Sequence, residues 1–552
     1  MNPPSQIDYQ IMWNRLIAVV EEQAATLIRT AFSTSVREAG DLSAGLFDRR
    51  GRMIAQAVTG TPGHVNAMAE SVTHFVAEIG VEEIFEGDVL ITNDPWMGTG
   101  HLHDITIVSP VFRNQTHIGY FACTAHVVDI GGRGFGPDGT EVFEEGLLIP
   151  IMKFAERDAV SKDLLRLIRA NVRTPDQTVG DIYSLAACNQ AGDRRLQAML
   201  DEFGIDNIDG LSNFIIDTSR AATHAAIAKV PDGCFEHTMQ VDGYEAPVHM
   251  AVRLDITGET LHADFAGTSG MSKFGVNCPE VYTRAYACYG LKCAIAPEVP
   301  NNTGSLEPFR ITAPEGCILA ATRPAPVSVR HVMGHLVPDV VLGALHKALP
   351  DTVPAEGASA LWNIQISARP SVPMSDLPNR EVLMFNSGGT GARPTIDGLS
   401  ATAFPSGVST MSVEATEHVG PITVWRKDLR PDSGGAGAQR GGLGQTIEIE
   451  PRDGYDLYFN AMFDRVSNPA QGRSGGLPGA AGRVALADGT ELRSKGRQLI
   501  GNGQRLCLSL PGGGGYGPPA NREPAQIAAD LDAELITEEQ ARADYGYDSQ
   551  QD

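Results

Sequence analysis

Apolar side chains recur at helical spacing near the start of the chain. Over residues 7–32 they fall three or four positions apart, and charged residues such as Glu21 and Arg29 are left for the opposite side. This pattern predicts one amphipathic helix whose apolar face packs on a protein core. The next segments, 42–48 and 52–57, alternate in polarity on either side of a turn that contains glycine, which predicts a β-hairpin.

A second helix and three more strands are expected before residue 130. A helical pattern begins at Asn66, a residue suited to an N-cap, and ends at Ile79 before Gly80. Short apolar runs predict three strands, over residues 88–92, 105–112 and 117–126. The last two would pair antiparallel, so the loop before one would lie beside the end of the other. Loops and strand ends are where functional side chains commonly gather.

The rest of the chain mixes helical and strand patterns. Helical spacing returns at residues 163–170, 176–187, 194–203, 278–294, 327–348 and, as a polar helix or pair of helices, 524–545. Alternation predicts strands at 251–256 and 260–265, and short strands with glycine-rich turns fill about 360–520. We therefore predict an α+β protein, a large multi-domain mixed α/β architecture with antiparallel or mixed sheets and a β-rich, Gly-rich C-terminal half.

Five regions are expected along this architecture. They are an N-terminal region with the candidate metal site (1–155), a helical region (156–230), a mixed α/β region (231–355), a β-rich region (356–523) and a helical tail (524–552). A chain of 552 residues is too long for one simple core, which favours several domains.

Charge and composition exclude several classes of function. The formal net charge of −24 opposes binding to nucleic acid or to an anionic membrane through general electrostatics. No run of about 18 apolar residues indicates a transmembrane helix, and no basic start followed by an apolar run indicates a secretory signal. The eight cysteines form no CxxC pair, so neither a zinc ribbon nor a thioredoxin-type site is indicated. A cytoplasmic protein with reduced thiols is the simplest interpretation.

The segment His101-Leu-His-Asp104 carries the densest group of ligand-capable side chains. On a turn, His101 and Asp104 can face one centre, whereas an extended chain points them to opposite sides. His126 stands at the end of the predicted partner strand. Two imidazoles and carboxylates suit zinc, manganese or iron in the divalent state. A hydrogen-bonded loop is the competing interpretation.

Neighbouring carboxylates carry weaker indications. From spacing alone, Asp41 is best interpreted as a cap or turn residue. Asp129 is either a further ligand or an acceptor that orients His126. Glu144 and Glu145 are available as general bases, although an exposed acidic pair is the simpler interpretation.

Two other patterns suggest less chemistry. Glycine-rich runs occur at 386–393 and 511–517, but neither has the Gly-Lys-Ser/Thr ending of a phosphate loop or clearly opens a helix after a strand. Tight turns are the expected role of these glycines. His331 and His335 lie four positions apart without the Glu of an HExxH motif, so a packed or surface pair is expected.

Several motifs in one order resemble the hydantoinase B/oxoprolinase family over nearly the whole chain. The matching segments are 38–43, 93–104, 126–132, 145–150, 430–437, 440–444, 511–517 and 541–546. The resemblance implies that Asp41, His101, Asp104 and His126 together hold a divalent metal. It is this match, and not spacing, that makes Asp41 a ligand, at a position where relatives can have the longer Glu.

The resemblance also implies a reaction shared between two polypeptides. A hydantoinase A-type ATPase subunit would phosphorylate the carbonyl oxygen of a cyclic amide or imide, and this chain would hydrolyse the activated species with water whose pKa the metal lowers toward about 7. Asp129 or Glu145 would orient that water or accept its proton. A hetero-oligomer is expected. The alternatives are a subunit of an ATP-dependent acetone- or acetophenone-type carboxylase and a non-catalytic scaffold for the ATPase.

Overall fold

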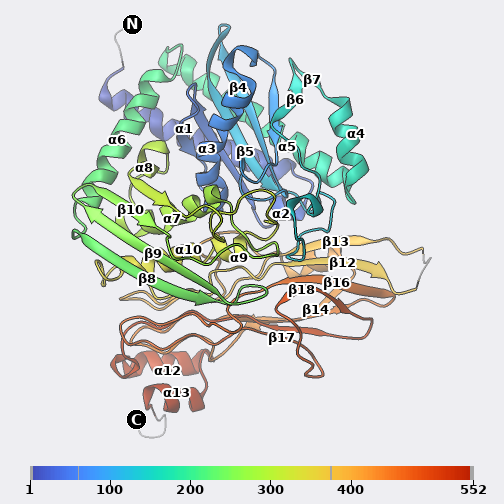
Figure 1. Ribbon diagram of the computed structural model, residues 1–552, viewed down its shortest axis with the longest axis vertical. Coiled ribbons are helices and arrows are strands. Elements are labelled where there is room, and N and C mark those ends of the chain that lie inside the picture. Colours follow the sequence, from blue (N-terminus) through green and yellow to red (C-terminus); the bar gives the residue numbers. More distant parts are fainter. Residues whose placement is uncertain (1–3, 60, 373–375, 548–552) are drawn as a thin grey trace.

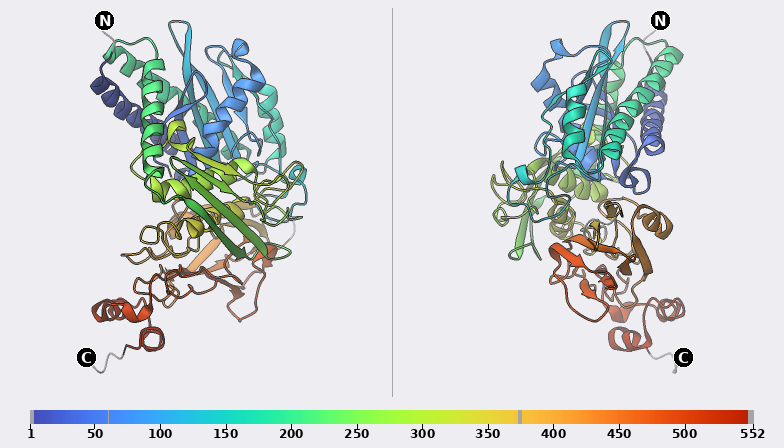
Figure 2. Two further views of the ribbon diagram at one scale, coloured as in Figure 1. Left: turned by 60° about the vertical axis from the view of Figure 1, so that its left-hand side comes forward. Right: turned by 90° about the vertical axis from the view of Figure 1, so that its right-hand side faces the viewer.

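The computed structural model describes residues 4–59, 61–372 and 376–547, and within these it has four sheets with helices packed against them (Figure 1). The N-terminal sheet and its helices form one end of an elongated molecule, and the C-terminal helices form the other (Figure 2). This arrangement confirms the predicted α+β class with antiparallel and mixed sheets. The division into five regions stays a prediction. None of the described helices combines the length and apolar character needed to cross a membrane.

The first sheet has the strand order β2-β1-β5-β4-β3-β6-β7, and each neighbouring pair is antiparallel. Its strands are β1 Leu42–Asp48, β2 Met53–Gln56, β3 Val89–Thr92, β4 Asp104–Arg113, β5 Thr116–His126, β6 Met152–Glu156 and β7 Ala159–Val160. The register places Asp104 directly opposite His126. The β4–β5 hairpin therefore brings two candidate ligands together by local pairing alone.

Helices cover both faces of this sheet. On one face, α1 (Gln6–Thr30) and α5 (Pro175–Phe203) pack against alternate strand residues, and on the other α3 (Pro62–Ile79) packs against the intervening ones. The predicted first helix is confirmed. Helix α3 begins at Pro62 rather than at Asn66, since proline fits the first turn of a helix. The other helices here are α2 Thr34–Arg37, α4 Lys162–Asn171 and α6 Asp209–Ile227.

Helix α5 is one continuous helix where the sequence pattern indicated two. The expected break contains Gly192, whose missing side chain makes room for the ring of Phe121 in β5; a Cβ there would lie 2.7 Å from the ring. This glycine serves close packing between helix and sheet, so it does not end the helix.

The second sheet has the order β11-β10-β9-β8, with β10 and β11 parallel and the other pairs antiparallel. Its strands are β8 Gly233–Val241, β9 Val248–Thr257, β10 Thr260–Asp264 and β11 Phe309–Thr312. The helices of this part are α7 Glu280–Ile295, α8 Thr303–Leu306, α9 His331–Gly334 and α10 Val337–Leu345. The expected helix over 327–348 is split in two, because Pro338 opens α10 and cannot continue α9.

Two antiparallel sheets, β13-β12-β16-β18 and β14-β15-β19-β17, share one hydrophobic core in the C-terminal half. Their strands are β12 Ile364–Pro370, β13 Arg380–Met384, β14 Ile422–Leu429, β15 Gln445–Pro451, β16 Tyr455–Met462, β17 Arg483–Leu486, β18 Lys495–Ile500 and β19 Leu506–Ser509. The helices are α11 Val413–Val419, α12 Pro524–Asp532 and α13 Glu538–Tyr545, so the polar tail is a pair of helices.

The glycine-rich runs do not act as tight turns, contrary to expectation. Residues 388–391, 434–442 and 511–515, here called the glycine bundle, lie side by side outside the strands and bond backbone to backbone, for example from Gly513 N to Gly442 O at 3.0 Å. None of the glycines in these described segments has a positive φ. A Cβ on Gly513 would lie 2.0 Å from the carbonyl oxygen of Thr390. Glycine is required because the neighbouring backbones leave no room for a side chain.

Candidate metal centre

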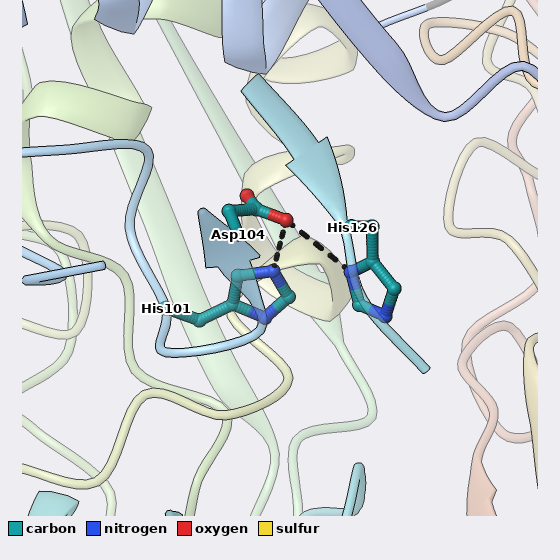
Figure 3. A group of neighbouring side chains, drawn as sticks. All are labelled: His101, Asp104 and His126. Carbon is teal, nitrogen blue, oxygen red and sulfur yellow. Dashed lines mark hydrogen bonds and ion pairs between the residues drawn. The ribbon is translucent and has the colours of Figure 1, made fainter. Parts of the chain in front are cut away.

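Three of the predicted ligands meet where β4 begins and β5 ends. His101, Asp104 and His126 are all buried, and both imidazoles point toward the carboxylate (Figure 3). His101 Nε2 lies 2.7 Å from Asp104 Oδ1, and His126 Nδ1 lies 3.3 Å from the same oxygen. The chain turns between His101 and β4, so the side chains of His101 and Asp104 face one centre. This is the arrangement expected for a turn and not for an extended segment.

The protonation state of His101 bears on whether a cation fits between its Nε2 and Asp104 Oδ1. Its Nδ1 is 2.8 Å from the carbonyl oxygen of Ser328, which can only accept, so Nδ1 carries the ring proton. Burial, reinforced by the nearby Arg330, lowers the pKa of His101 to about 3, so the ring is neutral and Nε2 presents a lone pair. That lone pair faces Asp104 Oδ1 without a hydrogen bond. A cation shared between two acceptors this close would relieve their repulsion, so these residues fit a divalent metal.

The second oxygen of Asp104 accepts two hydrogen bonds and lies beside a third polar side chain. Oδ2 accepts from Arg330 at 2.5 Å and from Thr99 Oγ1 at 2.6 Å, and His64 Nε2 lies 2.9 Å away. Burial works against ionisation of Asp104, but His101, His64 and Arg330 hold its pKa well below the ordinary value. The carboxylate is therefore ionised and fixed in orientation, with Oδ1 directed at the two imidazoles.

Asp41 lies at the wall of the same pocket and outside the tight three-residue group. It immediately precedes β1, and its backbone carbonyl accepts from the N–H of His126 at 3.2 Å. Its side-chain Oδ1 accepts from Thr61 Oγ1 at 3.0 Å and lies 3.7 Å from His64 Nδ1. The fold thus brings Asp41 beside His126 from a segment that sequence spacing alone did not connect to it.

The pocket itself has a volume of about 20 Å³. That volume suits one water molecule or one ion and is far too small for an organic substrate. His331 and His335 also line it, and each is only 3% exposed. They form a packed pair, which is one of the two arrangements expected from the sequence, the other being a surface pair. Their spacing did not indicate that they face the candidate ligands. His64 and Arg330 were missed altogether, because no local pattern links them to Asp104.

Asp129 does not contact the candidate ligands. Its Oδ1 accepts from Gly131 N at 3.1 Å and from the guanidinium of Arg173 at 2.8 Å, and its Oδ2 accepts from the backbone N–H of Arg173 and Thr174. No hydrogen bond to His126 is found in the part of the chain that the structure describes. Asp129 therefore fastens the loop after β5 to the start of α5.

Glu145 is buried, at 1% exposure, and is not part of an exposed acidic pair. Its Oε1 accepts from the backbone N–H groups of Val327 and Ser328, at 2.7 and 2.8 Å. Burial raises the pKa of Glu145 to about 8, against the opposing effect of these two bonds. The carbonyl of Ser328 is bonded to His101, so Glu145 is linked to a candidate ligand through one residue. Glu145 is not among the residues that line the pocket.

Comparisons with known proteins agree with this architecture. The sequence profile of the hydantoinase B/oxoprolinase family matches residues 5–519. The chain is 28% identical to the caprolactamase subunit beta of Pseudomonas jessenii over 569 residues, covering 99% of this chain and 96% of that one. It is 26% identical to 5-oxoprolinase 1 of Arabidopsis thaliana, covering 94% of this chain but 42% of that longer protein.

Solved structures show the same similarity in three dimensions. The crystal structure of the ATP-dependent caprolactamase from Pseudomonas jessenii superposes with a TM-score of 0.89 at 26% identity, over 100% of this chain and 98% of that chain. Nucleotide-free acetone carboxylase superposes with a TM-score of 0.86 over 98% of this chain and 79% of that chain, but at 20% identity, which shows a shared fold alone. With its profile matched from residue 5 to residue 519, the chain belongs to the hydantoinase B/oxoprolinase family.

Proposed function

We propose that this chain is the metal-containing subunit of an ATP-dependent amidohydrolase, which hydrolyses a cyclic amide or imide after a partner ATPase subunit has activated it by phosphorylation. The observation that carries the proposal is the contact between the lone pair of His101 Nε2 and Asp104 Oδ1 at 2.7 Å. Hydrolysis is favoured over carboxylation because the caprolactamase subunit and the oxoprolinase, at 28% and 26% identity, are named for amide hydrolysis.

Asp41, His101, Asp104 and His126 would hold the ion, and two imidazoles with two carboxylates suit zinc, manganese or iron. When bound, such an ion supplies Lewis-acid polarisation and lowers the pKa of water toward about 7. One hydrogen bond within the chain already keeps a ligand in the form that can coordinate a metal. The Ser328 carbonyl keeps the proton of His101 on Nδ1, which leaves Nε2 free to coordinate.

His331 is a polar side chain that faces the pocket without a complete set of partners. Its ring lines the pocket and its Nδ1 has no hydrogen-bond partner. Burial, with His335 and Arg330 nearby, holds the pKa of His331 well below its usual value, so the ring is neutral and would orient a water molecule by a hydrogen bond. We assign positioning roles to Glu145, through Ser328, and to Asp129, through the loop after β5.

The packing of the glycine-rich runs in this chain supports an ATP site on another polypeptide. The glycine runs that could have formed phosphate loops are packed against one another in the glycine bundle, and N–H groups such as those of Gly389, Gly442 and Gly513 are bonded to neighbouring carbonyls. The similar caprolactamase chain is named as a subunit, and the longer oxoprolinase contains more than this chain spans. Both observations support a hetero-oligomer with a hydantoinase A-type ATPase subunit.

Co-expression with a hydantoinase A-type ATPase subunit allows a direct test. The purified pair would be assayed with ATP against lactams and hydantoins, and then against ketones with labelled bicarbonate. Amide hydrolysis that needs ATP and is independent of bicarbonate supports the proposal. Incorporation of label into a ketone, without amide hydrolysis, would replace it with the carboxylase alternative. Unchanged coupled activity in a His101→Ala, His126→Ala double variant would favour the scaffold alternative.

A further inference from the structure

A groove of about 530 Å³ lies between α12 and α13 at the C-terminal end of the molecule (Figure 1). Buried and half-buried apolar side chains line part of it, and exposed carboxylates line the rest. The apolar side chains include Leu531, Ile536 and Tyr547, and the acidic ones are Asp532, Glu534 and Glu538. No lysine or arginine is among the described lining residues. An apolar groove edged by acids fits a helix that carries both apolar and basic side chains.

Two of these carboxylates are available to a partner. Asp532 and Glu534 are exposed and take part in no ion pair among the residues that the structure describes, whereas Glu538 pairs with Arg542 at 2.7 Å. Residues 524–552 contain eight Asp and Glu residues, and Arg542 is the one basic residue of this segment. The groove therefore lies in a negative field that attracts a cationic surface.

Helix α12 is fastened to the glycine bundle, so the groove is formed before anything binds. Buried Arg522 donates to Asp397 at 2.8 Å and to Asp530 of α12 at 2.7 Å. Arg440 of the glycine bundle donates to the same Asp530 at 3.1 Å. A preformed groove avoids part of the entropy that ordering would cost on association.

Helix α4 has the complementary features. It packs one face against α5 and leaves Leu167 exposed on the other side. Lys162 and Arg166 are exposed and lie four positions apart, so they share one face of the helix. Lys162 is in no ion pair within the described part of the chain, and Arg166 lies 3.7 Å from exposed Asp163. Helix α4 thus presents a leucine with two accessible cations.

The groove and α4 cannot meet within one chain. Figure 1 shows α4 beside the N-terminal sheet, whereas α12 and α13 lie beyond the C-terminal sheets, at the other end of the elongated molecule. Contact between the two surfaces therefore joins separate copies head to tail. Such a contact uses a different surface on each copy, so it continues into a ring or an open chain of subunits.

We propose that the groove between α12 and α13 binds helix α4 of a second copy of this chain. Leu167 would enter the apolar part of the groove, and Lys162 and Arg166 would pair with Asp532 and Glu534. Charge selects this occupant, because the chain as a whole carries a net charge of −24 and an acidic surface would be repelled by the groove. The inference does not depend on the proposed function, since assembly is measured without turnover.

Exchanging the charges of the two surfaces tests the proposal in the full chain. The groove variant combines Asp532→Lys with Glu534→Lys, and the helix variant combines Lys162→Glu with Arg166→Glu. Asp532 ends α12 and Lys162 begins α4, so each of these two positions receives the charge that its helix end favours, and thermal unfolding should confirm folding. Glu539→Lys changes an exposed acid of α13 outside the groove and is the matched control.

Sedimentation velocity over a range of concentrations measures the self-association. The wild type and Glu539→Lys should associate, and each exchanged variant alone should dissociate with a Kd at least about tenfold higher, because like charges then face each other. An equal mixture of the two exchanged variants should recover association, because a basic groove then meets an acidic α4 and an acidic groove meets a basic one.

Three results would overturn the proposal. The first is a wild type that stays monomeric, and the second is a mixture of folded variants that does not recover association. The third needs no variant: association that is unchanged in 1 M salt, where charges are screened beyond about 3 Å. If the groove variant instead loses a co-expressed ATPase subunit while its self-association is unchanged, the groove binds that partner and not a second copy.

Discussion

Replacing Glu145 tests whether a buried carboxyl positions the metal site or takes part in the reaction. Its Oε1 accepts from two backbone N–H groups, of Val327 and Ser328, and the carbonyl of Ser328 holds His101. Glu145→Ala removes the acceptor from both donors, whereas Glu145→Gln retains a carbonyl oxygen of nearly the same shape. The pair of variants therefore separates the hydrogen bonds from the ionisable group.

The expected magnitudes follow from these contacts. A buried donor left without a partner costs about 1–3 kcal/mol, so losing the acceptor of two donors should lower the free energy of unfolding by about 2–6 kcal/mol in Glu145→Ala. Displacement of Ser328 would also release His101, and loss of such supporting contacts lowers metal affinity about 10–100-fold. Glu145→Gln should preserve both quantities, because the raised pKa of about 8 means that the native carboxyl is mainly protonated at neutral pH.

Chemical unfolding and metal competition with a chelator measure these effects, and pH adds an independent check. The folded state holds the Glu145 proton up to a pKa of about 8, and the ordinary value is 4.5. The folded state thus binds more protons between these values, so this group's contribution to stability is present below pH 4.5 and is lost as pH rises toward 8. The Glu145→Gln variant should lack that decline.

Two results would refute the reasoning. If Glu145→Gln folds and binds metal normally but loses coupled turnover, Glu145 exchanges a proton with the reacting groups and is not only a positioning residue. If Glu145→Ala keeps wild-type metal affinity, the link through Ser328 to His101 does not support the site.

Other parts of the structure give three further expectations. A His101→Ala, His126→Ala double variant should lose bound divalent metal and coupled hydrolysis, and elemental analysis showing unchanged metal content would contradict the site. Arg330→Met should lower stability by about 3–5 kcal/mol, because it leaves a buried carboxylate without its cation; a loss below about 1 kcal/mol by chemical unfolding would speak against that pairing. Gly513→Ala should cost more than about 3 kcal/mol or prevent folding, whereas Gly270→Ala, with nothing within 4 Å of its added Cβ, should stay within about 1 kcal/mol; similar melting temperatures for the two would contradict the packing argument.

Local pattern was sufficient for the elements that carry the first ligands. The first helix, the β1–β2 hairpin and the β4–β5 pair follow from periodicity, and pairing then sets Asp104 opposite His126. The pattern misled where a residue served tertiary packing, as Gly192 does in α5. The sequence alone does not distinguish a glycine that makes room for a neighbouring ring from a glycine that ends a helix.

The surroundings of the site could not be predicted for a different reason. Arg330 binds Asp104 across 226 positions of sequence, and His64 reaches it from a helix on one face of the sheet. Glu145 belongs to a charged pair that spacing assigns to the surface, yet the 327–330 turn covers it. Such contacts depend on how separate layers dock, which no local periodicity encodes.

The glycine bundle imposes an order on how the chain can fold. Its three segments span residues 388 to 515, and each is bonded to the others by backbone groups without side-chain packing between them. Contacts that distant in sequence form slowly, because a long loop must close before any bond is gained. During synthesis the last segment, 511–515, leaves the ribosome after nearly everything it binds. The C-terminal half should therefore stay open and exposed to proteolysis until that segment arrives, long after the hairpin holding Asp104 and His126 has been able to form.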